Sequence, residues 1–176
     1  MPQSPTRVFL IGPMGSGKTA VGRQLAKMLN LAFYDSDVEV EQRTGVDIPY
    51  IFEREGEVGF RQRERETIDA LTSLDHVLIA TGGGAVLLPQ NREYLHQRGC
   101  AVYLQTSIEQ QLERTRHGRH RPLLYTADPE AKLRELMAIR APLYEATAHM
   151  IIPTDGRHVR GVAEDIVQRL RQEQPA

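Results

Sequence analysis

Residues 8–19 read Val-Phe-Leu-Ile-Gly-Pro-Met-Gly-Ser-Gly-Lys-Thr, and this stretch decides the fold. Its second part, from Gly12, fits the pattern G-x-x-x-x-G-K-[ST] of a phosphate-binding loop. The apolar run Val8–Ile11 is typical of a buried strand, and residues 20–29 place apolar side chains at the spacing of an amphipathic helix. The motif therefore lies between a strand and a helix, which is the context that supports it.

The loop has the chemistry of a nucleoside triphosphate site. Glycines let the backbone bend so that several N–H groups point to one place, where the start of the next helix adds partial positive charge. Lys18 is expected to act on the terminal phosphates, and the Thr19 hydroxyl is placed to ligate Mg²⁺. The alternative, a glycine-rich turn without a ligand, does not explain the complete motif. The nucleotide-binding residues expected in the loop are Gly12, Gly15, Ser16, Gly17, Lys18 and Thr19.

Composition limits what else the chain does. Its 176 residues, 40% of them hydrophobic, suit one domain with a substantial core. A formal net charge of −1 gives no electrostatic reason to expect binding to nucleic acid or membranes. The single Cys100 excludes an internal disulfide and fits a reducing compartment. Because residues 1–7 lack the apolar core of a signal peptide and no run approaches the roughly 20 apolar residues of a membrane span, we expect a soluble, cytoplasmic monomer.

Short apolar runs alternate with longer helical patterns along the chain. This alternation predicts βαβ units and a parallel sheet covered on both faces. We interpret residues 38–73, with breaks near 44–47 and at Gly56, as three helices, and the aperiodic residues 114–125 as a second insertion in a single domain of residues 1–176. The expected strands are 8–11, 31–34, 76–80, 101–104 and 149–152, and the other expected helices are 20–29, 89–98, 107–113, 129–147 and 159–172.

Charged residues and glycines follow the second and third expected strands. Ligands of open parallel sheets bind beyond the carboxyl ends of the strands, so Asp35, Asp37 and the run Thr81–Gly84 should converge with the phosphate-binding loop on one cleft. Asp35 is a candidate for holding Mg²⁺ through water, and Asp37 for accepting a hydroxyl proton or orienting that hydroxyl. The alternatives are that the aspartates only cap the next helix and that the glycines only form a turn.

These segments resemble the shikimate kinase family, and the resemblance extends from the phosphate-binding loop to the last helix. Its specific elements are F-R-x-x-E at 60–64, the glycine triplet at 82–84 and R-x-P-L-Y at 140–144. The resemblance implies a nucleoside-monophosphate-kinase-like α/β/α fold with a five-stranded parallel sheet in the order 2-3-1-4-5. It also implies transfer of the ATP γ-phosphoryl group, with Mg²⁺, to the 3-hydroxyl of shikimate in aromatic amino-acid biosynthesis.

Shikimate is a small ring that carries a carboxylate and three hydroxyls. Its carboxylate needs planar bidentate donors, which arginine supplies and lysine does not. By resemblance, Arg61 and Arg140 hold the carboxylate, Glu64 holds Arg61, and residues 38–73 form the substrate-binding region. The other substrate-binding residues that the resemblance implies are Asp37, Phe52, Phe60, Gly82, Gly83 and Gly84.

Residues 114–125 are rich in arginine, and by resemblance they form a mobile lid over the nucleotide. In that comparison Arg114 stacks on adenine, and Arg121 acts on the transferring phosphoryl group, from which a closed lid excludes competing water. The alternative is a solvated basic loop. Residues 154–159 lack the Asn or Pro that many members of the family have there, so no adenine contact is assigned to them.

Two other functions remain open. A gluconate-type or nucleoside monophosphate kinase would use the same loop, but it would leave F-R-x-x-E and the glycine triplet unexplained. A catalytically silent nucleotide-binding protein that acts through a partner would have to lack a functional group. The groups that the sequence retains are Lys18, Thr19, Asp35, Asp37, Arg61, Arg121 and Arg140.

Overall fold

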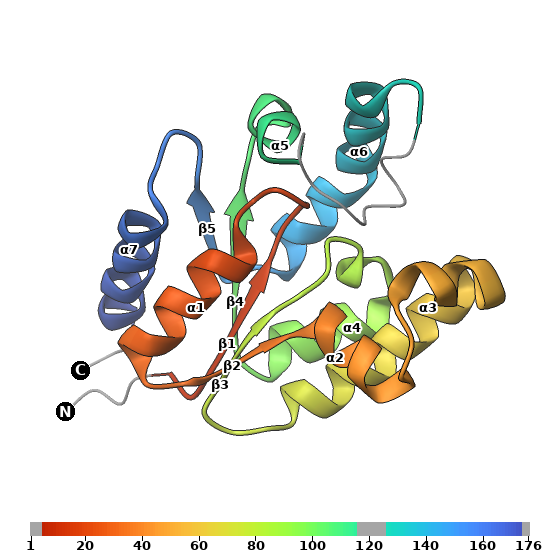
Figure 1. Ribbon diagram of the computed structural model, residues 1–176. Coiled ribbons are helices and arrows are strands. Elements are labelled where there is room, and N and C mark those ends of the chain that lie inside the picture. Colours follow the sequence, from red (N-terminus) through yellow and green to blue (C-terminus); the bar gives the residue numbers. More distant parts are fainter. Residues whose placement is uncertain (1–4, 116–125, 174–176) are drawn as a thin grey trace.

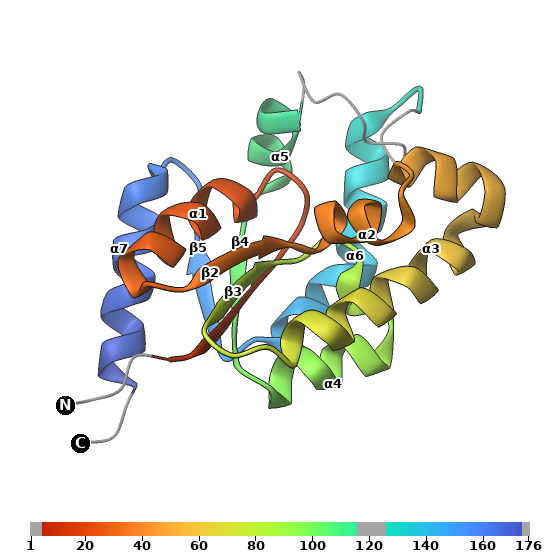
Figure 2. The same cartoon turned by 60° about the horizontal axis from the view of Figure 1, so that its bottom comes forward.

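The computed structural model describes residues 5–115 and 126–173 and contains a central sheet with helices on both faces (Figures 1 and 2). All strand pairs are parallel, and the strand order is β2-β3-β1-β4-β5. The expected α/β class and the 2-3-1-4-5 order are therefore confirmed. The strands are β1 (Arg7–Ile11), β2 (Ala32–Asp35), β3 (Val77–Ala80), β4 (Cys100–Gln105) and β5 (Met150–Pro153).

The helices form the two outer layers. Helices α1 and α7 pack together on one face, while α4, α6 and the second half of α3 cover the other (Figure 2). Helices α2 and α5 follow β2 and β4 directly, at the carboxyl ends of those strands. The helices are α1 (Lys18–Leu29), α2 (Ser36–Thr44), α3 (Ile48–Thr72), the short 3-10 helix η1 (Ala85–Leu87), α4 (Pro89–Gln97), α5 (Ile108–Thr115), α6 (Pro129–Thr147) and α7 (Val159–Gln172).

Strand β1 joins the two layers of the core. Val8 and Leu10 pack into the apolar cluster beneath α1 and α7, and Phe9 and Ile11 pack into the cluster on the opposite face. All four side chains are inaccessible to solvent. A strand that is buried on both faces has to be apolar at every position, which explains the uninterrupted apolar run before the phosphate-binding loop.

Most element boundaries lie within two residues of the prediction, and the expected three helical segments in residues 38–73 are present. Gly56, with φ 71° and ψ −176°, interrupts α3 and divides it in two. The predicted start of the aperiodic segment at residue 114 is wrong, because α5 continues to Thr115, and η1 was not expected. Helix α5 continues past its predicted end because its last turn packs on the phosphate-binding loop at Gly15. Gln111 of this turn is fully buried.

Aspartates begin three of the helices. The side chains of Asp35, Asp47 and Asp128 each accept a hydrogen bond from backbone N–H groups in the first turn of α2, α3 and α6. Such a cap satisfies N–H groups that have no partner within the helix, and it contributes about 1 kcal/mol. The capping interpretation of the Asp-Ser-Asp run is thus correct for Asp35, which leaves its second carboxylate oxygen for another role.

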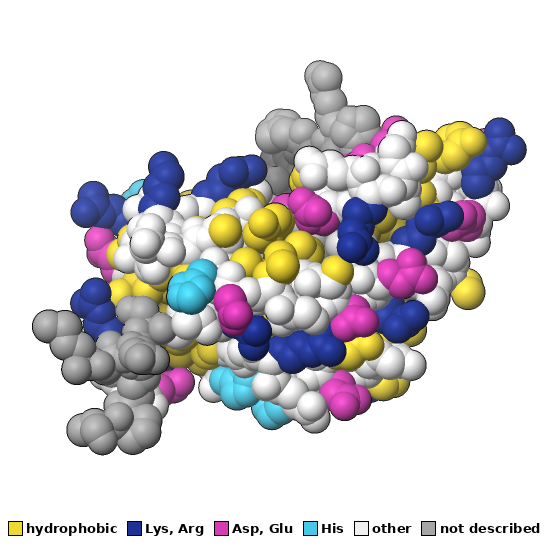
Figure 3. Space-filling view, turned by 90° about the horizontal axis from the view of Figure 1, so that it is seen from below, with side chains coloured by type: hydrophobic (Ala, Val, Ile, Leu, Met, Phe, Trp, Pro, Cys, Tyr) yellow, Lys and Arg dark blue, Asp and Glu magenta, His cyan; other side chains and the backbone are white. Residues whose placement is uncertain are grey.

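The molecular surface carries charges of both signs (Figure 3). On the face that Figure 3 shows, basic and acidic side chains are interspersed, as a formal net charge of −1 leads one to expect. No helix in the described part of the chain combines the length and the apolar composition that a membrane crossing requires.

Helix α1 lies very close to the sheet at Gly22. A Cβ atom at this position would lie 2.7 Å from a ring carbon of Phe33, 3.1 Å from Leu78 and 3.3 Å from Leu10, so side chains of three strands meet the bare helix backbone. Gly161 in α7 is a matched contrast, because a Cβ atom there would have no heavy atom within 4 Å. The first glycine is required by packing, and the second is not.

We predict that Gly22→Ala lowers the free energy of unfolding by about 1–2 kcal/mol, because overpacking outweighs the gain in helix propensity. The control Gly161→Ala should raise it by about 0.5–1 kcal/mol, since only the propensity changes. Urea titration followed by circular dichroism measures both values. Equal effects of the two substitutions would show that α1 does not depend on this close approach.

Candidate active site

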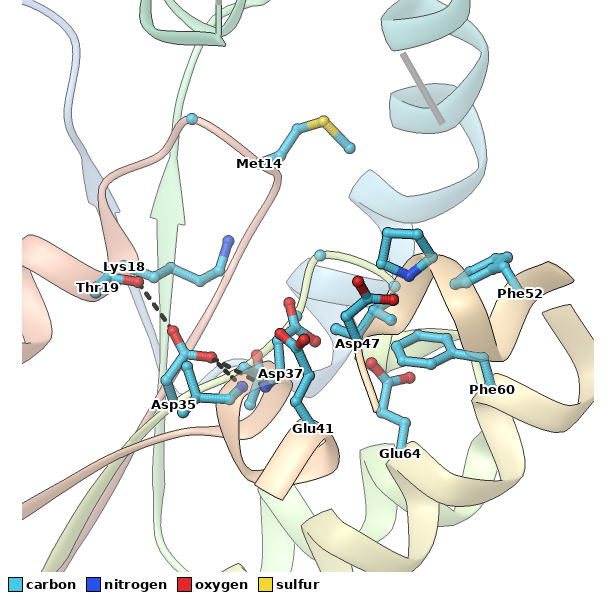
Figure 4. Close-up of a pocket in the computed structure, with 18 of the residues that line it drawn as sticks. Met14, Lys18, Thr19, Asp35, Asp37, Glu41, Asp47, Phe52, Phe60 and Glu64 are labelled. Carbon is cyan, nitrogen blue, oxygen red and sulfur yellow. Dashed lines mark hydrogen bonds between the residues drawn. The ribbon is translucent and has the colours of Figure 1, made fainter. Parts of the chain in front are cut away.

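A cavity of about 830 Å³ opens at the carboxyl ends of β1, β2 and β3 (Figure 4). The phosphate-binding loop and the start of α1 line one end. The other end is lined by α2, α3, the segment after β3, which we call the glycine loop (Thr81–Gly84), and Arg140 of α6. The strand order explains this arrangement, because β3 lies between β1 and β2 and brings the three following segments to one edge of the sheet.

The phosphate-binding loop has a backbone that only glycine adopts easily. Gly12, Gly15 and Gly17 have φ angles of 146°, 77° and 89°, all in the region that disfavours other residues. At Gly12 there is also no room for a side chain, because a Cβ atom would lie 2.7 Å from the Leu104 carbonyl oxygen. The neighbouring strand and α5 therefore hold the loop in a single shape.

Lys18 is the cation of this loop. Its Nζ donates hydrogen bonds to the carbonyl oxygens of Gly12 (2.6 Å) and Pro13 (2.7 Å) and to the Ser16 hydroxyl (3.3 Å). The side chain is 9% exposed, so its charge is largely shielded from water. An ammonium group fixed inside a curved backbone is a ready site for an anion.

Arg114 joins α5 to the outer side of the same loop. Its guanidinium donates to the Gly15 carbonyl oxygen at 3.0 Å and to the Thr154 carbonyl oxygen at 3.5 Å, and the residue also lines the cavity. It thus connects the loop, the end of α5 and the segment after β5. The stacking of Arg114 on adenine stays a prediction, and it would place the adenine beside this guanidinium.

Thr19 and Asp35 bring two oxygen ligands together. The Thr19 hydroxyl donates to Asp35 Oδ2 at 3.1 Å, while Asp35 Oδ1 caps α2 (Figure 4). Mg²⁺ prefers oxygen ligands and commonly retains several waters, so a hydroxyl and one carboxylate beside a phosphate site fit this ion. These residues can hold Mg²⁺ next to the loop.

Asp37 lies between the two ends of the cavity. Burial raises the pKa of its carboxyl group to about 7, with a further increase from the negative charges of Glu64 and Asp35 and opposition from Lys18 and Arg61. The side chain is also a lining residue of the cavity. A carboxylate that binds a proton near neutral pH is chemically suited to accept one from a hydroxyl.

Arg61 and Glu64 form a buried ion pair on α3. Arg61 Nη1 lies 2.9 Å from Glu64 Oε1, and the two residues are 7% and 0% exposed. The pair leaves Arg61 Nε and Glu64 Oε2 buried without hydrogen-bond partners among the described residues. Unsatisfied polar atoms are costly in a protein interior, so the chain keeps this ion pair at a cost in stability.

Arg140 adds a second buried guanidinium, with 4% of the residue exposed. Burial lowers its pKa, and the positive charge of Arg61 lowers it further. Two cations that lie close together in a water-poor wall repel each other, and an anion between them relieves both the repulsion and the lost hydration. This end of the cavity is therefore suited to a carboxylate.

The backbone of the glycine loop lies very close to charged side chains of the site. A Cβ atom at Gly82 would lie 2.7 Å from Asp37 Oδ1 and 3.0 Å from Glu64 Oε2, and one at Gly84 would overlap the guanidinium of Arg61. At Gly83 the nearest atom would be the Met14 backbone nitrogen at 3.4 Å, which is an ordinary contact. Two of the three glycines thus leave space for the charged side chains of the site itself.

Phe52 and Phe60 form the apolar wall. Their ring centroids are 4.9 Å apart, and the Arg61 guanidinium carbon lies 5.1 Å from the centroid of the Phe60 ring. Both rings belong to a small apolar cluster with Val40 and Ile51. The wall gives the cavity a flat apolar surface beside its charged end.

The structure brings most of the predicted site residues to one cavity, with a few exceptions. Gly12 and Ser16 do not line it, and instead hold Lys18 from behind. Arg121 lies outside the described residues. Val38, Glu41, Asp47, Ile48 and Pro49 line the cavity within the predicted substrate-binding region 38–73, although none of them was named individually. Met14 and Thr81 lie in the phosphate-binding loop and the glycine run, and only Ala20 lies outside the predicted site segments.

Comparison with known proteins agrees with this site. A protein-family model described as shikimate kinase matches residues 14–171. The chain is 54% identical over 169 residues to a shikimate kinase of Halorhodospira halophila, with 96% of each chain covered. It is also 54% identical over 168 residues to a shikimate kinase of Pseudomonas fluorescens, with 96% of this chain and 98% of the relative covered.

A solved structure is similar over the same length. The shikimate kinase of Acinetobacter baumannii, determined in complex with shikimate, has a TM-score of 0.96 and 48% sequence identity, with 99% of this chain and 97% of that chain covered. The family model, the relatives and the fold agree across nearly the whole sequence, and the chain belongs to the shikimate kinase family.

Proposed function

We propose that the protein transfers the γ-phosphoryl group of ATP to the 3-hydroxyl of shikimate and releases shikimate 3-phosphate and ADP. The observation that carries this proposal is the pair of buried guanidinium groups, Arg61 and Arg140, at one end of a cavity whose other end is a phosphate-binding loop. A ligand with a carboxylate at one side and a hydroxyl at the other suits these two ends. The A. baumannii relative was solved with shikimate, which supports that choice.

The nucleotide end of the cavity positions the group that is transferred. Lys18 is proposed to bind the β- and γ-phosphates, and the backbone of Gly15 and Gly17 to cradle them. Thr19 and Asp35 would hold Mg²⁺, Asp35 through water. When bound, Mg²⁺ neutralises negative charge on the phosphate oxygens. Arg114 is proposed to contact the nucleoside, because it lies between the loop and the segment after β5.

The substrate end orients the acceptor. Arg61 and Arg140 are proposed to bind the carboxylate, Glu64 to hold Arg61, and Phe52 and Phe60 to cover the ring. The glycine loop would lie against the substrate hydroxyls. Asp37 is proposed to hold the 3-hydroxyl and to accept its proton as the oxygen attacks, since its carboxylate faces the same cavity.

Several assignments rest on the sequence pattern. We retain the interpretation of residues 1–176 as one kinase domain with a substrate-binding region at 38–73, and Phe52, Phe60, Arg61 and Glu64 of α3 support the position of that region. The lid at 114–125 and the action of Arg121 on the transferring phosphoryl group stay predictions, because residues 116–125 lie outside the described residues. A cytoplasmic location and a monomeric state also stay predictions.

The two alternative functions explain less of the site. Gluconate also has a carboxylate and hydroxyls, but an open-chain acid gives no reason for the apolar wall of Phe52 and Phe60. A nucleoside monophosphate offers a phosphate and a base in place of a small carboxylic acid. A catalytically silent protein gives no reason for Lys18, Asp37 and Arg140 to line one cavity.

A coupled ADP-release assay with shikimate, gluconate, AMP and UMP as separate acceptors tests the proposed function. Turnover with shikimate alone is expected. Turnover with another acceptor and none with shikimate would contradict the proposal, and so would ATP binding without turnover on any acceptor.

We predict that Lys18→Ala reduces turnover by a factor of at least about 100 while the fold persists. The substitution removes a preorganised charge that acts on the phosphates, and loss of such a donor typically costs about 3–4 kcal/mol. Lys27→Ala, at the exposed end of the same helix, is the matched control and should leave the rate unchanged. A Lys18→Ala rate within tenfold of the wild type would exclude this role of Lys18.

Replacing Arg61 or Arg140 by Lys should weaken shikimate binding by about 1.5–3 kcal/mol, because lysine cannot form the planar pair of charge-assisted hydrogen bonds. The affinity for ATP should change little. Arg63→Lys, on the same helix but exposed and paired with Glu55, is the control and should leave both affinities intact. Isothermal titration with each ligand measures the effect, and equal weakening of ATP and shikimate binding would show that these arginines do not define the acid site.

A further inference from the structure

Tyr144 makes a hydrogen bond to the glycine loop, and the proposed reaction assigns no role to this bond. The residue lies on α6, four positions after Arg140, and its side chain is fully buried. Its hydroxyl donates a hydrogen bond to the Gly83 carbonyl oxygen at 2.5 Å, across 61 residues of sequence. A single bond therefore connects the helix that carries one buried arginine to the loop that borders the cavity.

The side chain of Tyr144 has apolar surroundings, so its hydroxyl depends on this hydrogen bond. Its ring packs against Tyr103 of β4, with centroids 5.0 Å apart, in the same apolar cluster as Phe9 and Ile11. A buried hydroxyl is costly when it has no hydrogen-bond partner. Without the bond to Gly83, phenylalanine would therefore be more stable than tyrosine at this position. Burial also raises the pKa of Tyr144, so the hydroxyl stays protonated and able to donate at neutral pH.

The glycine loop is held at a second point as well. The Gly82 N–H donates to the hydroxyl oxygen of Ser36 at 3.0 Å, and Ser36 is fully buried at the start of α2. The two bonds fix both sides of the peptide between Gly82 and Gly83. Consecutive glycines have many accessible backbone conformations, so a loop of this composition needs such anchors to keep one of them.

The position of Gly83 matters because of its neighbours. A Cβ atom at Gly83 would lie 3.4 Å from the Met14 backbone nitrogen of the phosphate-binding loop and 3.6 Å from Arg140 Nη1. The guanidinium of Arg140 also lies near the Tyr144 hydroxyl. Movement of Gly83 would therefore change the space between the nucleotide end of the cavity and the guanidinium that is proposed to bind the carboxylate.

We propose that Tyr144 is a positioning residue for shikimate, whose hydroxyl holds the Gly83 carbonyl and so keeps the glycine loop and Arg140 in the arrangement that binds the substrate. Tyr144 does not contact the reacting atoms in this account. It lowers the cost of binding because the loop is already ordered before the substrate arrives. The inference rests on the proposed phosphorylation of shikimate.

Steady-state kinetics of Tyr144→Phe, with Tyr103→Phe as the matched control, test the inference. Each substitution removes one hydroxyl from the same buried ring pair, but only Tyr144 bonds the glycine loop. We expect Tyr144→Phe to raise the KM for shikimate about five- to tenfold, the range that one hydrogen bond supplies, with the KM for ATP within about twofold of wild type. Tyr103→Phe should leave both constants unchanged.

The outcomes separate this inference from the proposed function. Wild-type turnover of shikimate together with equal KM values in Tyr144→Phe and Tyr103→Phe would overturn the inference alone. Absence of wild-type turnover would overturn the function and the inference together. If Tyr144→Phe does not fold, Ser36→Ala removes the side-chain bond to the Gly82 N–H and should raise the KM for shikimate in the same way. A KM equal to that of the wild type would then overturn the inference.

Discussion

Burial of charge beneath the glycine loop is the constraint on which the site depends. Arg61, Glu64 and Arg140 are all less than 8% exposed, and the Asp37 carboxyl group is close to Arg61 and Glu64. Buried charges are tolerated only when they are paired and hydrogen-bonded, and here the pairing is incomplete, since Arg61 Nε and Glu64 Oε2 have no partner among the described residues. An anion between the guanidinium groups of Arg61 and Arg140 offsets their repulsion, so the site is less stable by itself than with an anionic ligand.

The same constraint explains features that lie outside the charged cluster. Gly82 and Gly84 lack side chains because the carboxylates and the Arg61 guanidinium occupy the space where those side chains would lie. A chain segment with that composition is flexible, so bonds from Ser36 and Tyr144 restrain it. The parallel sheet supplies the frame, because β3 runs between β1 and β2 and delivers the loop to the side of Lys18 and Asp35.

Sequence reasoning recovered the features that local patterns encode. The strand Val8–Ile11, the helix Val159–Gln172 and the nucleotide loop follow from apolar periodicity and from a motif with fixed spacing. The resemblance to a family supplied Arg61, Glu64 and Arg140. Arg140 lies nearly 80 residues from Arg61 in the sequence, and periodicity does not reveal that the two line the same cavity. The strand ends lie within one residue of the prediction, and the largest differences are at the start of α1 and the end of α5, where contacts with the phosphate-binding loop extend the helix beyond its apolar pattern.

Other features could not be read from the sequence because they depend on contacts between distant segments. The bond from Tyr144 to Gly83 and the space that Arg61 takes at Gly84 arise only when α3, α6 and the glycine loop meet. The extension of α5 to Thr115 likewise depends on its contact with Gly15. The sequence did not show that Gly82 and Gly84 leave room for charged side chains of the protein itself.

The central claim is that two buried arginines select a carboxylate. Isothermal titration of the wild-type protein with shikimate and with its methyl ester tests this claim most directly, because the ester keeps the ring and the hydroxyls but lacks the negative charge. The account predicts that the ester binds at least about tenfold more weakly than shikimate, as the loss of charge-assisted hydrogen bonds requires. Equal affinity for the acid and the ester would contradict it.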